Sequence, residues 1–369
     1  MSAGRTCGGR ATHRKKREAH RVTVAYTGAP EWRFMAAGGR TGNTTVVFAP
    51  AIMRTAPPPL KVCFIDMNAG VENQAMRCLQ SVIARFESEL RESNPTLPIE
   101  VCTVSPRDTL HTIPRGHDLY IASGGPGAPL EGLGTSWYDD FRRFSDELIE
   151  AHDRDAGDAP AMFAICYSYE LVSMHLGIAD VVQRDGRKFG VMPVYTTTAG
   201  RHHPLLAPFG DRLFAFEHRN WEVVNLDEKR LNAMNGAVLA RESREGRDDK
   251  GEAVLAFNVS EAIETVQFHP EADLAGIFNW IDRPEQQKAF VDSYGDLTFE
   301  RMLKTIKNPE RVARVHHEVI PGWMRRRFNS IYAARGWDAM PYGPVEALSG
   351  ADLSVLLGAN AELPSAPSL

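Results

Sequence analysis

Cys166 follows a short apolar run, AMFAIC (161–166), and polar and aromatic residues come directly after it. The run is typical of a buried strand, and the segment behind it, which ends at Gly177, is typical of a helix. A thiol at such a junction lies near a helix N-terminus, whose partial positive charge and free N–H groups lower its pKa. Cys166 is therefore a candidate nucleophile. A small, inert core cysteine is the alternative that this pattern alone leaves open.

A candidate general base and its partner occur together in FHPE (268–271). His269 and Glu271 are two residues apart in an extended segment, so their side chains lie on the same face. The carboxylate can hold the imidazole in one tautomer while the other ring nitrogen takes a proton from the thiol. This pattern predicts a Cys-His-Glu set, although an H-P-E sequence can also simply end a strand at the surface.

A glycine-rich turn, ASGGPGAPLEG (122–132), follows the strand-like DLYIAS (118–123). It fits neither phosphate-binding pattern, G-x-x-x-x-G-K-[ST] or G-x-G-x-x-G. Glycines let backbone N–H groups approach a ligand closely, so this turn is a candidate source of an oxyanion donor beside Cys166. A plain β–α turn is the alternative.

Alternating strands and helices must position these three segments. Strand-like runs occur at 61–66, 99–105, 118–123, 161–166 and 264–269, and helical periodicity is clear at 73–90 and 137–152. This order predicts an α/β protein with an open, mostly parallel, doubly wound sheet. Residues 189–260 are richer in β-type runs and turns.

The sequence becomes helical after about residue 290. We expect one helix that begins near Asn308 and stops at Pro321-Gly322, and a second that ends at Gly336. Arg325–Arg327 are expected on a solvated helix face, with docking onto an acidic partner or closure over the site as the alternative. The histidine pairs 202–203 and 316–317 lack metal-ligand spacing and are expected at the surface.

Composition excludes several classes of protein. The chain has 369 residues, of which 43% are hydrophobic, and a net charge of −5, which gives no reason to expect a nucleic acid partner. No apolar run approaches the roughly 20 residues that span a bilayer. The five cysteines form no C-x-x-C pair, so we expect neither a disulfide scaffold nor a structural zinc site, and the expected compartment is the cytoplasm. We also expect no cofactor. Residues 1–58 carry ten Lys and Arg against two Glu, and we expect them to be disordered.

The strand–SGGPG, strand–Cys–helix and strand–HPE segments, in this order, resemble the class I glutamine amidotransferases. The resemblance is nearest to the amidotransferase domain of GMP synthase, includes KFGVMPVYTT (188–197), and covers about residues 60–282. It implies a flavodoxin-like fold in which Cys166 is the nucleophile, His269 the base and Glu271 its orienter. The oxyanion donors it implies are the N–H groups of Gly125 and Tyr167.

Two segments depart from the pattern of this family. Its members usually have Cys-x-Gly-x-Gln, whereas Ser168 and Glu170 stand here, and FAFEHRNWEVV (214–224) keeps only His218 of a histidine-glycine-acid motif. The resemblance implies that Glu170 and His218 border the substrate. An ionised Glu170 would repel the carboxylate of glutamine.

The resemblance implies an enzyme that hydrolyses the side-chain amide of glutamine and supplies ammonia to an acceptor on a partner synthetase. The alternatives are a thiol hydrolase or acyltransferase of the same fold that acts on another amide or γ-glutamyl compound, and a regulatory relative without turnover. The expected organisation is a basic segment (1–58), an amidotransferase-like domain (59–290) and a helical C-terminal extension with a tail (291–369).

Overall fold

The computed structural model describes residues 57–93, 97–109, 112–243, 252–308 and 310–337. The predicted disordered segment (1–58) and the C-terminal tail lie almost entirely outside these residues. Within them the strands are β1 (Leu60–Ile65), β2 (Ile99–Val104), β3 (Leu119–Ala122), β4 (Ala161–Ile165), β5 (Asp180–Thr196), β6 (Arg212–Val224), β7 (Ala237–Arg241), β8 (Val254–Val259) and β9 (Ile263–Val266). The longer helices are α1 (Ala75–Ser93), α3 (Ser136–Asp155), α4 (Tyr167–Leu176), α7 (Leu274–Ile281), α8 (Pro284–Tyr294), α9 (Asp296–Ile306) and α10 (Val312–Ala334). Shorter helical segments are α2 (Pro106–Thr109), α5 (Thr198–His202), α6 (Glu228–Ala233), and the 3₁₀ turns η1 (Pro129–Gly132) and η2 (Ala207–Phe209).

One sheet, in the order β2-β1-β3-β4-β9-β8-β6-β5-β7, forms the centre of the protein. Its first five strands are parallel, which agrees with the predicted α/β class. The prediction of an open, mostly parallel sheet is not confirmed. The remaining strands pair antiparallel. Because β7 pairs with both β5 and β8, the four strands β5, β6, β7 and β8 form a closed, barrel-like arrangement. Residues 260–262 alone connect β8 to β9, which is too short for the crossover that a parallel pair needs.

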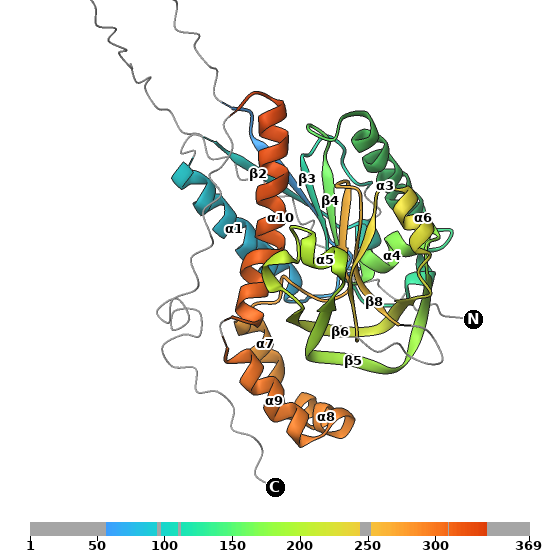
Figure 1. Cartoon of the computed structure of the whole chain (residues 1–369), viewed down its shortest axis with the longest axis vertical. Helices are drawn as coiled ribbons and strands as arrows, with labels where there is room; N and C mark the ends of the chain where they lie inside the picture. The colour runs from blue at the N-terminus through green and yellow to red at the C-terminus, as the bar shows by residue number, and fades with distance from the viewer. Residues whose placement is uncertain (1–56, 94–96, 110–111, 244–251, 309, 338–369) are drawn as a thin grey trace, which may run out of the picture.

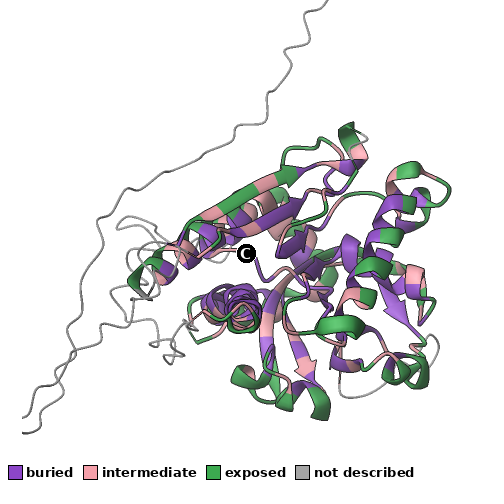
Figure 2. Cartoon of the chain, turned by 90° about the horizontal axis from the view of Figure 1, so that it is seen from above, coloured by how far each residue is buried: buried purple, intermediate pink, exposed green. Residues whose placement is uncertain are grey.

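Helices cover both faces of the parallel part of the sheet (Figure 1). α1 and α10 share one hydrophobic core with β1, β3 and β4, and α3 and α4 share a second core on the opposite face. The central strands β1, β3, β4 and β9 are almost wholly buried, whereas the edge strand β2 and the outer helix surfaces carry exposed residues (Figure 2). No helix within the described ranges is both long and apolar enough to cross a membrane.

The helix α10 continues through Pro321, so the predicted stop at Pro321-Gly322 is wrong. A proline in a helix interior removes one hydrogen bond and costs about 3 kcal/mol. Aromatic packing offsets this cost, because Trp323 is fully buried against Phe163 of β4 and Phe328 against Phe86 of α1. The C-terminal extension therefore shares a core with the sheet. The domain boundaries expected from the sequence stay predictions.

The arginine run on α10 does not form a solvated face, which corrects the first expectation for residues 325–327. Arg327 is 1% exposed and Arg325 is 9% exposed. Each arginine binds a carboxylate of the same chain: Arg325 that of Glu89, Arg326 that of Glu264 and Arg327 that of Glu261. The acidic surface that this run contacts is thus the protein's own.

The expected surface position of the second histidine pair is also wrong, because His316 and His317 are both buried. His317 hydrogen-bonds Arg85 of α1, and His316 Nδ1 lies 3.1 Å from the carbonyl oxygen of Glu271. Of the other pair, His202 is exposed and His203 is half-buried.

Candidate active site

Cys166 occupies the junction of β4 and α4, as the sequence predicted. Its backbone has φ 49° and ψ −104°, a conformation that residues other than glycine rarely adopt. Such strained conformations occur mainly at functional sites. The N–H of Cys166 bonds the carbonyl oxygen of Val266 at 2.8 Å, and its own carbonyl oxygen accepts from Glu170 N–H at 3.0 Å. These two bonds hold the strained turn between the sheet and the helix.

His269 and Glu271 lie beside this cysteine, just beyond the end of β9. The Nδ1 atom of His269 is 2.8 Å from Glu271 Oε1, and the ring and Cys166 both lie against Gly124, since a Cβ there would be 2.9 Å from His269 Cε1 and 3.4 Å from Cys166 Cβ. Burial disfavours the charged ring, but the carboxylate of Glu271 and the thiol of Cys166 outweigh it and raise the pKa of His269 well above its ordinary value. Since Nδ1 faces the carboxylate, Nε2 is the nitrogen available to the thiol. The structure therefore places the three predicted residues close together, and their catalytic roles stay a prediction.

Two further contacts fix the position of this histidine and its partner. His269 N–H donates to the carbonyl oxygen of Phe216 on β6 at 2.8 Å. Glu271 is 2% exposed, and its backbone carbonyl oxygen contacts His316 of α10. The C-terminal helix thus contacts the backbone of the residue that is predicted to orient the base.

The glycine turn lies directly against the same residues. A Cβ at Gly124 would be 2.9 Å from His269 Cε1 and 3.4 Å from Cys166 Cβ, so only glycine fits there. A Cβ at Gly125 would be 2.2 Å from the carbonyl oxygen of Met67, which again excludes a side chain. Tyr167 opens α4, where the first N–H groups have no partner within the helix. The oxyanion role of Gly125 and Tyr167 stays a prediction, and this position of the turn is compatible with it.

The two residues that depart from the family motif both point into the protein. Ser168 is fully buried, and its hydroxyl donates to the carbonyl oxygen of Ser123 at 2.6 Å, so it ties α4 to the glycine turn. Glu170 is 2% exposed, and its Oε1 accepts from Gln267 Nε2 at 2.9 Å. The same Gln267 nitrogen lies 3.7 Å from Cys166 Sγ. The contact that the structure gives Glu170 is therefore with Gln267, and its contact with substrate stays a prediction.

Burial raises the pKa of Glu170 to about 7. The hydrogen bond from Gln267 and the charge of Arg219 act in the opposite direction but do not cancel it. A carboxyl group with such a pKa is partly protonated at neutral pH. Its smaller negative charge reduces the repulsion that was expected between Glu170 and a substrate carboxylate.

His218 is exposed on β6, on the same face of the strand as Phe216, whose backbone binds His269. Although the side chain is open to solvent, it is crowded enough that partial desolvation and the charge of His269 lower its pKa. The next residue, Arg219, points the other way and is 4% exposed, bound to Glu217 at 2.7 Å and to Glu242 at 2.8 Å. The altered motif thus combines an outward histidine near the base with an inward ion-pair network.

The sequence reasoning missed two residues that hold the site. Gln267 is two residues before His269, and the alternation of the strand through residues 267, 269 and 271 carried a signal for it. Arg107 bonds the carbonyl oxygens of Met67 at 2.7 Å and Pro126 at 2.8 Å, and its guanidinium lies 4.3 Å from the centre of the Tyr167 ring. No motif marks Arg107, because its partners come from three separate segments of the chain.

Solved structures similar to this chain include several glutamine amidotransferases. One, from Thermotoga maritima, has 16% sequence identity and a TM-score of 0.48, and covers 73% of this chain and 97% of its own length. A protein from Thermoplasma acidophilum, described as part of a GMP synthase, has 20% identity and a TM-score of 0.39, with coverage of 65% and 98%. The glutaminase domain of a Trypanosoma brucei CTP synthase, solved with bound acivicin, has 13% identity and a TM-score of 0.42, with coverage of 57% and 86%.

No known family profile matches the sequence, and no curated protein matches it. The three solved structures named above all have TM-scores below 0.5 and sequence identities of 20% or less. Likeness at this level does not define a substrate. The chemistry of the site itself must carry the functional conclusion.

Proposed function

We propose that this protein is a thiol-dependent amidase of the glutamine amidotransferase type, which hydrolyses the side-chain amide of glutamine through a thioester on Cys166. One observation carries the proposal: a cysteine in a strained strand–helix junction lies beside His269, and His269 binds the buried carboxylate of Glu271 at 2.8 Å. A nucleophile, a base and an orienting group connected in this order are the requirements for acyl transfer by a thiol.

The proposed reaction has two halves. In the first, His269 Nε2 takes the thiol proton, the sulfur attacks the amide carbon, and the oxyanion is stabilised by the N–H groups of Gly125 and Tyr167. His269 then gives the proton to the departing nitrogen, and ammonia leaves. In the second half, water activated by His269 attacks the thioester, which releases glutamate and restores the thiol. Glu271 keeps Nδ1 protonated throughout and stabilises the imidazolium in each half.

We further propose that the ammonia passes to an acceptor bound on a partner synthetase. The sequence carries no G-x-x-x-x-G-K-[ST] loop to activate such an acceptor within this chain. Neighbours of the fold include the glutaminase domain of a CTP synthase and a protein described as part of a GMP synthase, and this partnership is consistent with both.

The second candidate function is hydrolysis of another amide or γ-glutamyl compound by the same thiol. The replacement at position 170 favours it, since a carboxyl group stands where the family has an amide. Its burial and its bond to Gln267 weaken this argument, because they direct the carboxyl group away from solvent. A regulatory relative without turnover is disfavoured by the proximity of Cys166, His269 and Glu271.

Glutamate release from glutamine separates these functions. The full chain, with and without candidate synthetases, is incubated with glutamine, asparagine and γ-glutamyl amides, and free acid and ammonia are measured. Release of glutamate and ammonia in equal amounts from glutamine, lost in Cys166→Ala, is the expected result. Thiol-dependent release from a γ-glutamyl amide alone would establish the second function. No turnover of any substrate by a folded chain, with every candidate partner, would refute the proposed enzyme.

A further inference from the structure

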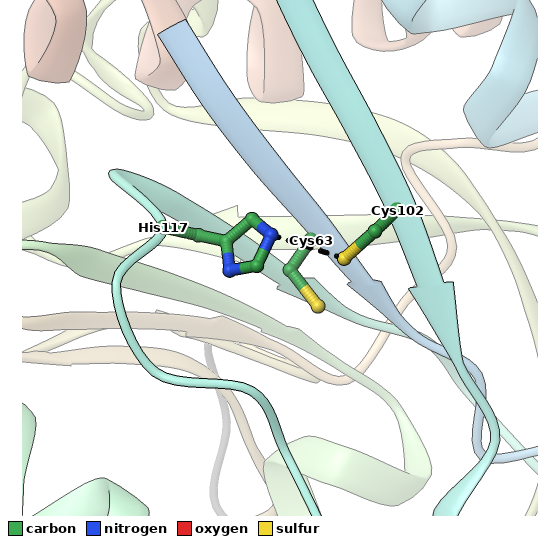
Figure 3. A group of neighbouring side chains, drawn as sticks. All are labelled: Cys63, Cys102 and His117. Carbon is green, nitrogen blue, oxygen red and sulfur yellow. Dashed lines mark hydrogen bonds between the residues drawn. The ribbon is translucent and has the colours of Figure 1, made fainter. Parts of the chain in front are cut away.

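Three side chains with metal-binding atoms converge at the outer edge of the sheet, away from the proposed reaction. The Sγ atoms of Cys63 and Cys102 and a ring nitrogen of His117 all lie within 4.8 Å of one another. Cys63 is in β1, Cys102 is in the edge strand β2, and His117 is in the segment that leads to β3 (Figure 3). They are the only such group of histidine, cysteine and acidic side chains among the residues that the structure describes.

The register of the sheet holds the two thiols together. Cys63 and Cys102 are direct partners in the parallel β1–β2 pair, so their side chains project from the same face. The third ligand is held by a separate set of contacts. His117 N–H donates to the hydroxyl of Tyr120, which in turn donates to the carbonyl oxygen of Pro114. Strand register and these contacts thus fix where each of the three side chains leaves the backbone.

The orientation of the His117 ring also supports a metal site. One ring nitrogen, Nε2, is 3.1 Å from Cys102 Sγ, whereas the buried Nδ1 has no hydrogen-bond partner in the described parts of the chain. A neutral imidazole carries one proton and one lone pair. When Nδ1 carries the proton, Nε2 directs its lone pair toward Cys102 Sγ, which is the orientation that a metal ligand needs. A cation held by this cluster would use the lone pair.

We propose that Cys63, Cys102 and His117 bind a thiophilic metal ion, specifically Zn²⁺. Tetrahedral zinc with ordinary bond lengths places its sulfur and nitrogen ligands about 3.5–3.8 Å apart. The observed separations, from 3.1 Å to at most 4.8 Å, span this value and need only rotation of side chains to reach it. Two thiolates and a neutral imidazole also balance the double charge of the ion, so the half-buried site carries no net charge. Three protein ligands leave the fourth position to water or to an added ligand.

The site would connect the edge strand β2 to β1 and to the segment before β3. Because the ligands are positioned only in the folded protein, bound metal should stabilise the fold in proportion to its occupancy. Binding should also release protons, since the thiols must ionise, and should strengthen as pH rises.

The test uses the full chain in a thiol-free reductant, with Cys166→Ala as the background because the proposed nucleophile and His269 can themselves bind metal. Co²⁺ is titrated as a spectroscopic probe for thiolate-to-metal charge transfer, and Zn²⁺ bound per chain is measured after desalting. We expect one equivalent of Zn²⁺, a Co²⁺ charge-transfer band that Zn²⁺ removes, and a higher melting temperature in Zn²⁺.

Two variants on the background test the assignment of ligands. Cys102→Ser and His117→Ala change half-buried side chains, so the fold should survive, and each should lose the bound equivalent and the charge-transfer band. Cys78→Ser alters another buried thiol and should keep both. Absence of stoichiometric binding in the folded background protein, or binding that survives both Cys102→Ser and His117→Ala, would overturn the proposal.

Discussion

Replacement of Glu170 by glutamine should make the stability of this protein less dependent on pH. Glu170 is buried at the start of α4, and its pKa is raised from 4.5 to about 7 because the charged form loses its hydration. The folded protein therefore keeps a proton that the unfolded chain releases at much lower pH. This proton contributes stability fully below pH 4.5, and the contribution is lost as pH rises through about 7. The gap between the two pKa values corresponds to roughly 3 kcal/mol at pH 8.

Glutamine has nearly the same shape, does not ionise, and can still accept the hydrogen bond from Gln267. Urea unfolding of the wild-type chain and of Glu170→Gln between pH 5 and pH 8.5 measures the difference. The two free energies of unfolding should be similar at pH 5, and the variant should be more stable by roughly 3 kcal/mol at pH 8. Glu150→Gln, on the exposed face of α3, serves as the matched control and should follow the wild type throughout. Parallel curves for Glu170→Gln and the wild type would refute the reasoning.

Three further predictions concern the base, the C-terminal helix and the start of the chain. Glu271→Gln removes the charge that raises the pKa of His269, so NMR titration of the ring should give a lower pKa, and kcat should fall by about two to four orders of magnitude; an unchanged kcat would contradict the assignment. Arg327→Ala should destabilise the fold by about 3 kcal/mol in urea unfolding, because it removes a fully buried side chain that donates to the carbonyl oxygens of Ala156 and Ala159, whereas Arg301→Ala, on an exposed face of α9, should cost less than about 0.5 kcal/mol. A chain that starts at Met53 keeps every residue that the structure describes and should melt at the wild-type temperature by calorimetry; loss of folded protein would show that the removed residues are needed.

The parts of the site that depend on local sequence could be predicted. A strand that ends at Cys166 and an extended FHPE segment are short-range patterns, and the alternation of a strand places His269 and Glu271 on one face without knowledge of the fold. The inward orientation of Glu170 could not be predicted in the same way. It depends on Gln267, which is close in space but 97 residues away along the chain.

Long-range packing also explains the features of the fold that were predicted wrongly. A proline such as Pro321 favours a helix end locally, but the aromatic contacts of α10 with the sheet and α1 outweigh that preference. Spacing in the sequence does not predict the cluster of Cys63, Cys102 and His117. Its members come from three segments, and strand register brings them together. The closure of β7 onto β8 is likewise a property of the assembled sheet.

Covalent labelling of the thiol tests the central claim most directly. The full chain is treated with a diazoketone analogue of glutamine, and intact mass and peptide mapping locate the adduct. Nucleophilic catalysis by Cys166 predicts one adduct per chain, on Cys166, that free glutamine suppresses and that Cys166→Ala abolishes while its unfolding temperature stays the same. Adducts spread over the other cysteines, or equal labelling of the folded Cys166→Ala variant, would contradict the account.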